Sequence, residues 1–93
     1  MAAKKRESAL EKEIREYAEA TGWWGVKFVS PGTAGVPDRL FIRGGMVLFM
    51  EVKRKGKKPT RQQYLRMAEI RKHGAIVCWV DSFAAAKEWL DFV

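Results

Sequence analysis

The feature that most constrains the fold is a pair of glycines, Gly44-Gly45, which lies between two segments of strand-forming residues. Residues 38–43 and 46–53 are rich in aliphatic and aromatic side chains. A two-residue glycine turn between such segments is typical of a β-hairpin. The turn fixes the register, because residues at equal distances from it along the two strands then lie opposite each other. The second strand is apolar on both faces, which is typical of an interior strand of a covered sheet.

Helices and strands are predicted on both sides of this hairpin. Apolar residues recur at helical spacing over 8–20, a strand is predicted over 24–29, and a loop rich in Gly and Pro follows over 30–37. After the hairpin, a helix over 61–72 begins with a capping box of Thr60 and Gln63. A strand over 75–80 and a helix over 83–92 complete the order α-β-β-β-α-β-α. This order predicts an α/β fold in which helices flank one mixed sheet.

Composition and charge narrow the class of protein. The chain has 93 residues, which predicts a single domain over 1–93 with a flexible basic tail over 1–6. No apolar stretch approaches the roughly 18 residues of a membrane span and no secretory signal is visible, so we expect a cytoplasmic protein, in the host cytoplasm if the chain is viral. The single Cys78 allows no internal disulfide and is predicted to be a core thiol. A net charge of +7 favours a nucleic-acid partner.

The hairpin register brings two carboxylates together at one end of an apolar face. Asp38 is predicted to lie opposite Glu51, with Cβ atoms roughly 4.5–5.5 Å apart, and Lys53 points to the same face as Glu51. Opposed carboxylates repel each other unless a cation lies between them, and hard oxygen ligands suit Mg²⁺ or Mn²⁺. The backbone carbonyl of Val52 is a plausible third ligand. The alternative is that Asp38 caps the preceding loop while Glu51 and Lys53 form an ordinary ion pair at a strand end.

The same residues resemble a known nuclease signature. The segment Gly35-Val-Pro-Asp38 followed by Glu51-Val-Lys53 resembles the PD-(D/E)xK motif. The flanking segments Lys27–Gly32 and Gly56–Pro59, together with Gln63, are similar to the VRR-Nuc branch, which includes stand-alone virus-type members of about this length. The resemblance covers roughly residues 7 to 82. It implies a restriction-endonuclease-like fold and a Mg²⁺-dependent endonuclease that cuts DNA, with Mn²⁺ as a substitute.

The resemblance implies a role for each residue of the motif. Asp38 and Glu51 would bind the metal with help from the Val52 carbonyl, and the metal would lower the pKa of a bound water and stabilise charge on the scissile phosphate. Lys53 would hold the attacking water and a phosphate oxygen.

Two further catalytic residues follow from the resemblance. In such enzymes a Glu on the first helix reaches the metal-bound waters. Both Glu7 and Glu11 are candidates, and we select Glu11; the alternative is that it is a solvated helix charge. Gln63 aligns with a catalytic Gln of the family, but its place in the capping box gives it an equally good structural role.

The basic residues predict contacts with DNA phosphates. The residues expected to bind nucleic acid are Lys27, Ser30, Arg54, Lys55, Lys57, Lys58 and Arg61. No base-reading motif is visible, so selectivity for the shape of branched DNA is expected. A homodimer that introduces paired nicks in four-way junctions is the predicted assembly. The alternatives are a nuclease that acts on flaps or nicks duplex, and a non-catalytic nucleic-acid-binding module. The four tryptophans are interpreted as core or interface residues.

Overall fold

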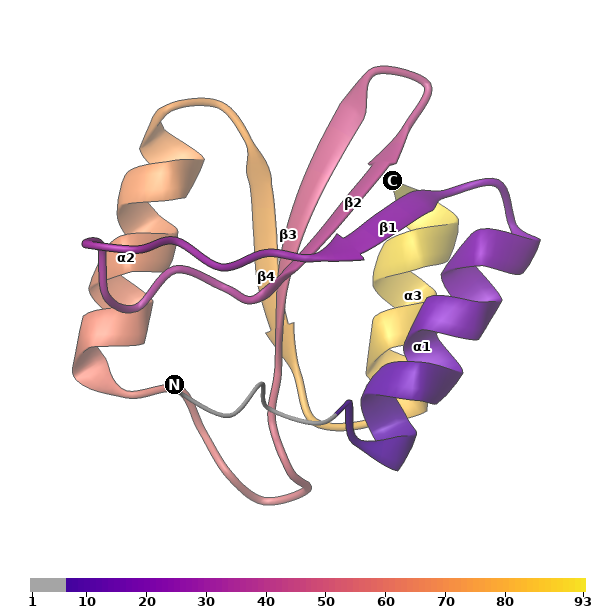
Figure 1. Ribbon diagram of the computed structural model, residues 1–93, viewed down its shortest axis with the longest axis horizontal. Helices are drawn as coiled ribbons and strands as arrows, with labels where there is room; N and C mark the ends of the chain where they lie inside the picture. Colours follow the sequence, from indigo (N-terminus) through magenta and orange to yellow (C-terminus); the bar gives the residue numbers. More distant parts are fainter. Residues whose placement is uncertain (1–6) are drawn as a thin grey trace.

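The computed structural model of the protein describes residues 7–93, so the tail predicted over 1–6 lies outside the described residues. A four-stranded sheet of order β1-β2-β3-β4 lies between α1 and α3 on one face and α2 on the other (Figure 1). The strands are β1 (Trp24–Lys27), β2 (Arg39–Arg43), β3 (Met46–Val52) and β4 (Ile76–Val80), and the helices are α1 (Ala9–Ala20), α2 (Arg61–Lys72) and α3 (Phe83–Phe92). The first three strands are antiparallel and β4 runs parallel to β3. This confirms the predicted mixed sheet and element order.

The glycine turn adopts the backbone conformation that the hairpin needs. Gly44 and Gly45 have φ angles of 55° and 80°, in the left-handed region that a non-glycine residue rarely adopts. The register is the predicted one, with Leu40 opposite Phe49 and Arg43 opposite Met46. The strands are shorter than predicted at four ends. Strands β1 and β3 end at Lys27 and Val52 instead of positions 29 and 53, and β2 and β4 begin one residue later than predicted.

Each helix begins at a capping side chain. The Ser8 hydroxyl accepts a hydrogen bond from the Glu11 N–H, and the Glu11 carboxylate accepts one from the Ser8 N–H, which completes a capping box at α1. Thr60 and Gln63 form the predicted capping box at α2. The Ser82 hydroxyl caps α3 by accepting a hydrogen bond from the Ala85 N–H. Local sequence therefore fixes where each helix starts, including the start of α1 beside the sheet.

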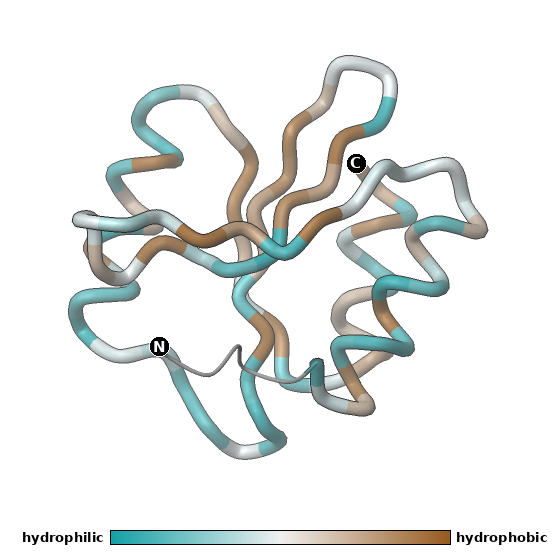
Figure 2. The backbone as a smooth tube through the Cα atoms, in the orientation of Figure 1, coloured by the Kyte–Doolittle hydropathy of each residue, from teal (hydrophilic) through white to brown (hydrophobic). Residues whose placement is uncertain are grey.

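The main core lies between the sheet and the α1–α3 pair. Phe41 and Leu48 are fully buried there against Ile14 of α1 and Leu90 of α3. The opposite face is covered by α2, where Met67 is buried. Figure 2 shows apolar residues along the strands in the middle of the molecule and hydrophilic residues along the outer loops. Because β3 lies between β2 and β4, it is the interior strand that its apolar sequence predicts.

The tryptophans and the cysteine divide between the interior and the surface. Trp23 is buried, with the Arg43 guanidinium 4.3 Å from the centre of its ring. Trp24 and Trp89 are 59% and 40% exposed, so these two are not core residues. Cys78 is buried as predicted, and burial raises the pKa of its thiol to about 12. Across residues 7–93, none of the helices is both long enough and apolar enough to cross a lipid bilayer.

Candidate active site at the end of the central hairpin

The two predicted acids lie at the open end of the hairpin, away from the glycine turn. Asp38 directly precedes β2, and its carbonyl accepts a hydrogen bond from the Phe28 N–H at 2.7 Å, which extends the pairing of β1 and β2 by one residue. Glu51 is the penultimate residue of β3. Continuation of the β2–β3 register past Arg39–Met50 places Asp38 opposite Glu51, as predicted.

The loop before Asp38 is held against α2, which fixes the position of this acid. Gly35 has a φ of 84°, and a Cβ atom added there would lie 3.0 Å from the Gln62 carbonyl oxygen. The Arg66 Nε donates a hydrogen bond to the Ala34 carbonyl at 3.0 Å. Figure 1 shows the loop running alongside α2. The glycine is therefore required both by the backbone conformation and by the close approach of the helix.

The Asp38 carboxylate is partly buried, and its Oδ1 has no hydrogen-bond partner among the described residues. Burial raises its pKa, and the negative charge of Glu11 raises it further, while Lys27 and Arg39 oppose the shift. Glu11 contributes because α1 reaches the same end of the sheet. An unpartnered carboxylate oxygen is costly to bury, and it is well suited to bind a cation.

Glu51 and Lys53 point to the same face of β3, as strand periodicity predicts. The Lys53 Nζ lies 3.8 Å from the Glu51 Oε2, and the two side chains are 19% and 10% exposed. At this distance the pair is longer than a direct hydrogen bond. The ammonium group is thus held near the carboxylate while remaining within reach of solvent.

The backbone carbonyl of Val52 points away from β4 and toward the side of β2. The Lys53 N–H donates to the Val80 carbonyl on β4, and the planar trans peptide directs the Val52 carbonyl the opposite way. Extension of the β2–β3 register places Pro37 opposite Val52, and proline has no N–H to donate. The hairpin ladder therefore offers this carbonyl no donor at Pro37, which is consistent with the predicted role of the carbonyl as a ligand.

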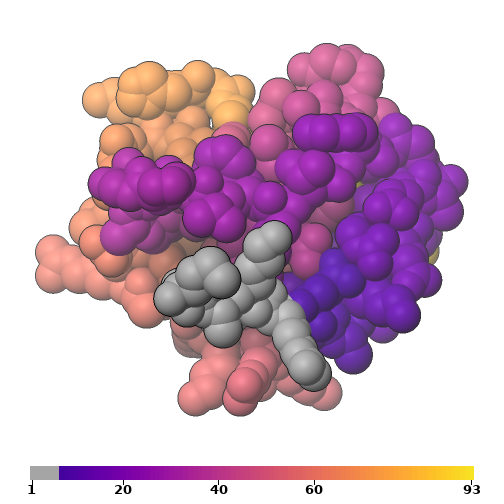
Figure 3. All heavy atoms as spheres, in the orientation of Figure 1, coloured from indigo at the N-terminus to yellow at the C-terminus, as the bar shows by residue number. Residues whose placement is uncertain are grey.

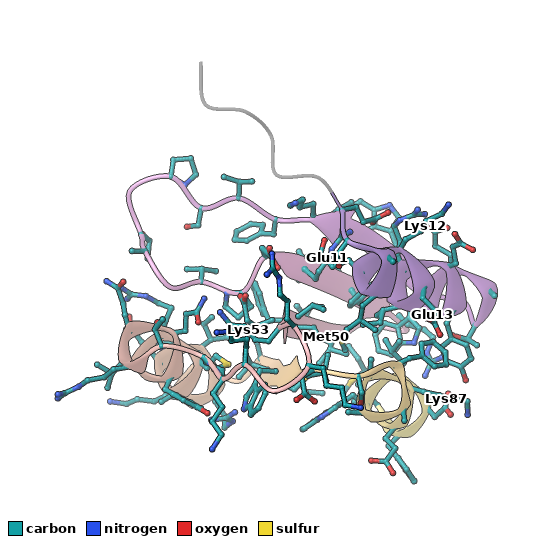
Figure 4. All side chains as sticks on the ribbon, turned by 90° about the horizontal axis from the view of Figure 1, so that it is seen from below. Glu11, Lys12, Glu13, Met50, Lys53 and Lys87 are labelled. Carbon is teal, nitrogen blue, oxygen red and sulfur yellow. The ribbon has the colours of Figure 1, made fainter. Side chains whose placement is uncertain are left out.

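Glu11 of α1 and Glu7, which precedes the helix, both contact Arg39, a residue that the sequence interpretation missed. The Arg39 Nη2 donates to the Glu7 Oε2 at 2.7 Å and to the Glu11 Oε2 at 3.1 Å. The Arg39 side chain is only 4% exposed. Figure 4 shows Glu11 extending from the inner side of α1, while Lys12 lies on its far side. Glu11 is therefore not a solvated helix charge. Alternation along β2 places Arg39 on the same face as the core residue Phe41, and this pattern could have revealed a buried, paired arginine.

Gln63 forms hydrogen bonds with Thr60 at the start of α2. Its side-chain Oε1 accepts a hydrogen bond from the Thr60 N–H at 2.9 Å, and its own N–H donates to the Thr60 hydroxyl at 3.2 Å. These bonds give Gln63 a capping role. A catalytic role for this residue stays a prediction.

The residues predicted to bind DNA surround this end of the sheet. The loop that follows β3 carries Arg54, Lys55, Lys57 and Lys58, all exposed, and it projects from the lower end of the molecule in Figure 3. The Asp81 carboxylate ties the loop to the start of α3 by accepting a hydrogen bond from the Gly56 N–H at 3.2 Å. Arg61 is exposed at the start of α2, whereas Lys27 and Ser30 are half-buried on the β1 side. Their contacts with DNA stay predictions.

The ligands that could hold a metal are few. Within residues 7–93, no three Asp, Glu, His or Cys side chains lie close enough together to form a metal site by themselves. Asp38 and Glu51 therefore provide two carboxylates, and a backbone carbonyl or water would have to complete the coordination. Mg²⁺ accepts such a set, because it keeps several waters and is commonly bound by one or two carboxylates.

Comparison with known proteins identifies the family. No family model matches the chain. A solved structure described as a VRR_NUC domain superimposes with a TM-score of 0.83 at 33% sequence identity, covering 92% of this chain and 95% of that one. The chain belongs to the VRR-Nuc family of nucleases. A phage protein described as "Putative nuclease p44", from Acyrthosiphon pisum secondary endosymbiont phage 1, is 40% identical over 78 residues, which are 83% of this chain and 84% of that protein.

Membership of the VRR-Nuc family gives the hairpin end its chemical context. The expected fold and the nuclease class are both confirmed.

Proposed function

We propose that this VRR-Nuc protein is a Mg²⁺-dependent DNA endonuclease whose active site is formed by Asp38, Glu51 and Lys53. The observation that carries the proposal is the buried Oδ1 of Asp38, which no described residue satisfies. It belongs to a carboxylate whose pKa is raised by burial and by Glu11, so this position is costly without a cation. Costly, charged arrangements of this kind are typical of active sites.

The donors at the hairpin end fit a hard divalent cation. Asp38, Glu51 and the Val52 carbonyl would hold Mg²⁺, and all three offer oxygen atoms, with Mn²⁺ as the expected substitute. When bound, Mg²⁺ would lower the pKa of water and offset negative charge on the phosphate. In the hydrolysis, the oxygen of water bonds to phosphorus while a phosphorus–oxygen bond to a sugar breaks, which leaves a phosphate on one end and a hydroxyl on the other.

Lys53 is placed to orient the reacting groups. Its Nζ lies 3.8 Å from the Glu51 Oε2, so the ammonium group is near the acid pair. A compact ammonium can donate one hydrogen bond to the attacking water and another to a non-bridging phosphate oxygen. Lys53 thus stabilises the negative charge that develops on phosphate in the transition state.

The substrate we propose is branched DNA. The exposed basic loop after β3 lies beside the acid pair and can bind backbone phosphates on either side of the cut. No base-reading motif is visible in the sequence. Recognition by backbone shape is therefore favoured, and a four-way junction offers the two-fold symmetry of a dimer.

The dimer surface we propose lies on α3. Trp89 and Phe92 are 40% and 88% exposed, and together with Glu88 they line a shallow hollow. Large exposed aromatic side chains are typical of protein interfaces. A two-fold dimer would place two active sites in a fixed relation, which paired nicks require.

A substrate panel tests the proposal. Labelled four-way junction, flap, linear duplex and single strand are incubated with the protein in Mg²⁺ or in EDTA, and sedimentation gives the oligomeric state. We expect cleavage only in Mg²⁺, fastest for the junction, and a dimer at micromolar concentration that Phe92→Ser weakens. Equal rates on junction and linear duplex would remove the junction preference, and a monomer would remove the paired nicks. DNA binding without cleavage of any substrate would support the non-catalytic alternative.

A further inference from the structure

Arg39 is a buried cation at the end of the sheet where the acids gather. Its side chain lies on the α1 face of β2, because residues two apart on a strand share a face and Phe41 is buried in the core with Ile14 of α1. It is 4% exposed, and its Nε has no hydrogen-bond partner among residues 7–93. A buried guanidinium is expensive to maintain. Its position therefore calls for an explanation beyond packing.

The two acids that contact Arg39 differ in which oxygens they use. Both oxygens of Glu7 are occupied, since Arg15 donates to Oε1 at 3.1 Å and to Oε2 at 2.9 Å, and Arg39 also donates to Oε2. Glu11 uses a single oxygen, because Ser8 and Arg39 both donate to its Oε2. The Glu11 Oε1 accepts no hydrogen bond from any described residue. Only Glu11 therefore has a carboxylate oxygen available for a further ligand.

We propose that Arg39 is a positioning residue, held by Glu7, that fixes the Oε2 of Glu11 so that its Oε1 faces the metal ion or a water of its coordination shell. Arg15 anchors Glu7 in turn, through the two hydrogen bonds of its guanidinium. This inference rests on the proposed function and extends it, because it separates the roles of Glu7 and Glu11. Glu11 acts at the site, whereas Glu7 acts through Arg39.

A merely structural role for Arg39 predicts a different pattern of losses. If the network only joins α1 to the sheet, loosening it lowers stability and should do so whether or not Glu11 is present. If the network acts through Glu11, its loosening should have no further effect on the site once Glu11 has lost its charge. Non-additivity of two substitutions distinguishes these cases.

The test uses Glu7→Gln, Glu11→Gln and the double variant, with Glu16→Gln as the matched control. Glu7 is 26% exposed, so its substitution is better tolerated than removal of Arg39, which would leave carboxylates unpaired around a buried position. Glu16 is on α1 with Glu11 and is 58% exposed in a pair with Lys12. For each protein, thermal unfolding checks the fold, calorimetry measures the affinity for Mn²⁺, and steady-state cleavage in Mg²⁺ gives kcat and KM.

We expect Glu7→Gln to lower both kcat and Mn²⁺ affinity by about 10–100-fold with little change in the KM for DNA. The double variant should then match Glu11→Gln, and the control should match wild type. Arg39→Lys, which keeps a charge able to donate to both acids, should retain more activity than Arg39→Met if both fold.

Two outcomes would overturn the inference while leaving the proposed function intact. In the first, wild type cleaves DNA but Glu7→Gln leaves kcat and Mn²⁺ affinity unchanged. In the second, Glu7→Gln lowers kcat and Mn²⁺ affinity by the same factor in wild type and in the Glu11→Gln background. A wild-type protein that neither cleaves DNA nor binds Mn²⁺ would overturn the proposed function, and this inference with it. If wild type binds Mn²⁺ but does not cleave, the calorimetric comparison of the same variants still decides the role of the network.

Discussion

Asp38→Asn should stabilise the protein in the absence of metal, although it removes a residue of the proposed active site. The carboxylate is partly buried, its Oδ1 has no partner among the described residues, and the charge of Glu11 lies nearby. An unsatisfied buried polar group costs about 1–3 kcal/mol, and asparagine removes the charge but keeps a polar amide. We therefore expect a gain of about 1 kcal/mol in the free energy of unfolding, which raises Tm by about 4–8 °C in a domain of this size.

The pH dependence of this gain follows from the direction of the pKa shift. The folded state raises the pKa of Asp38 above its value in the unfolded chain, so the folded state holds this proton more tightly. The contribution of Asp38 to stability is most favourable below the ordinary Asp pKa and is lost as pH rises through the raised value. The Tm difference between Asp38→Asn and wild type should thus be large at pH 7, and it should shrink as the pH falls below the ordinary pKa of Asp.

The assay is thermal unfolding in EDTA and in Mg²⁺, with Asp91→Asn as a control of opposite sign. Asp91 accepts a hydrogen bond from Lys87 at 2.8 Å and another from Tyr17, and these partners lower its pKa. Its contribution to stability is present above the ordinary Asp pKa, so Asp91→Asn should lower Tm at pH 7.

Metal binding should reverse the order of wild type and Asp38→Asn. Mg²⁺ at about ten times its Kd stabilises the protein that binds it by about 1.4 kcal/mol, and only wild type should show this gain. The reasoning is refuted if Asp38→Asn is less stable than wild type in EDTA at pH 7. It is also refuted if Mg²⁺ stabilises both proteins equally.

Two further predictions concern the DNA surface and the sheet. Substitution of Lys55, Lys57 and Lys58 by Gln should weaken binding to all DNA forms alike, because these exposed side chains are expected to bind only phosphates. The same substitution should flatten the plot of log K against log salt by about 0.9 for each phosphate that is no longer neutralised. Gly25→Ala should cost about 1–3 kcal/mol in unfolding experiments, because an added Cβ would lie 2.7 Å from the ring of the fully buried Phe41.

A control variant tests the cause behind each of these two predictions. Neutralising three exposed lysines on the helices, Lys12, Lys72 and Lys87, removes the same charge away from the loop and should change the salt slope less; equal slopes for the two triple variants would contradict the loop's role. Phe41→Leu should cost less stability in the Gly25→Ala background than in wild type, because a smaller side chain makes room. Equal costs in both backgrounds would mean that the close approach of the ring is not the cause.

Local sequence predicted the parts of the site that depend on the hairpin. The left-handed turn at Gly44-Gly45 fixes the register, and the register alone places Asp38 opposite Glu51. Strand alternation then puts Lys53 beside Glu51. These relations need only the two-residue period of a strand, so one chain is sufficient to derive them.

Contacts between distant elements were harder to predict. The charge of Glu11 raises the pKa of Asp38, and no local pattern gives the angle at which α1 approaches the sheet. Strand alternation could have indicated the buried face for Arg39, but its pairing with Glu7 and Glu11 depends on the same approach of α1. Burial of Trp23 and exposure of Trp24 likewise depend on how the helices cover the sheet.

The central claim is that Asp38 and Glu51 form a metal-dependent nuclease site, and nicking of supercoiled plasmid tests it most directly. Wild type should nick the plasmid in Mg²⁺ and not in EDTA. Asp38→Asn and Glu51→Gln should each lose about 100-fold or more of this activity, since outer-shell changes at metal sites already cost about 10–100-fold. Both variants should still bind DNA as well as wild type or more tightly, because each removes a negative charge near phosphates. Nicking at the wild-type rate by either variant in Mg²⁺ would contradict the account.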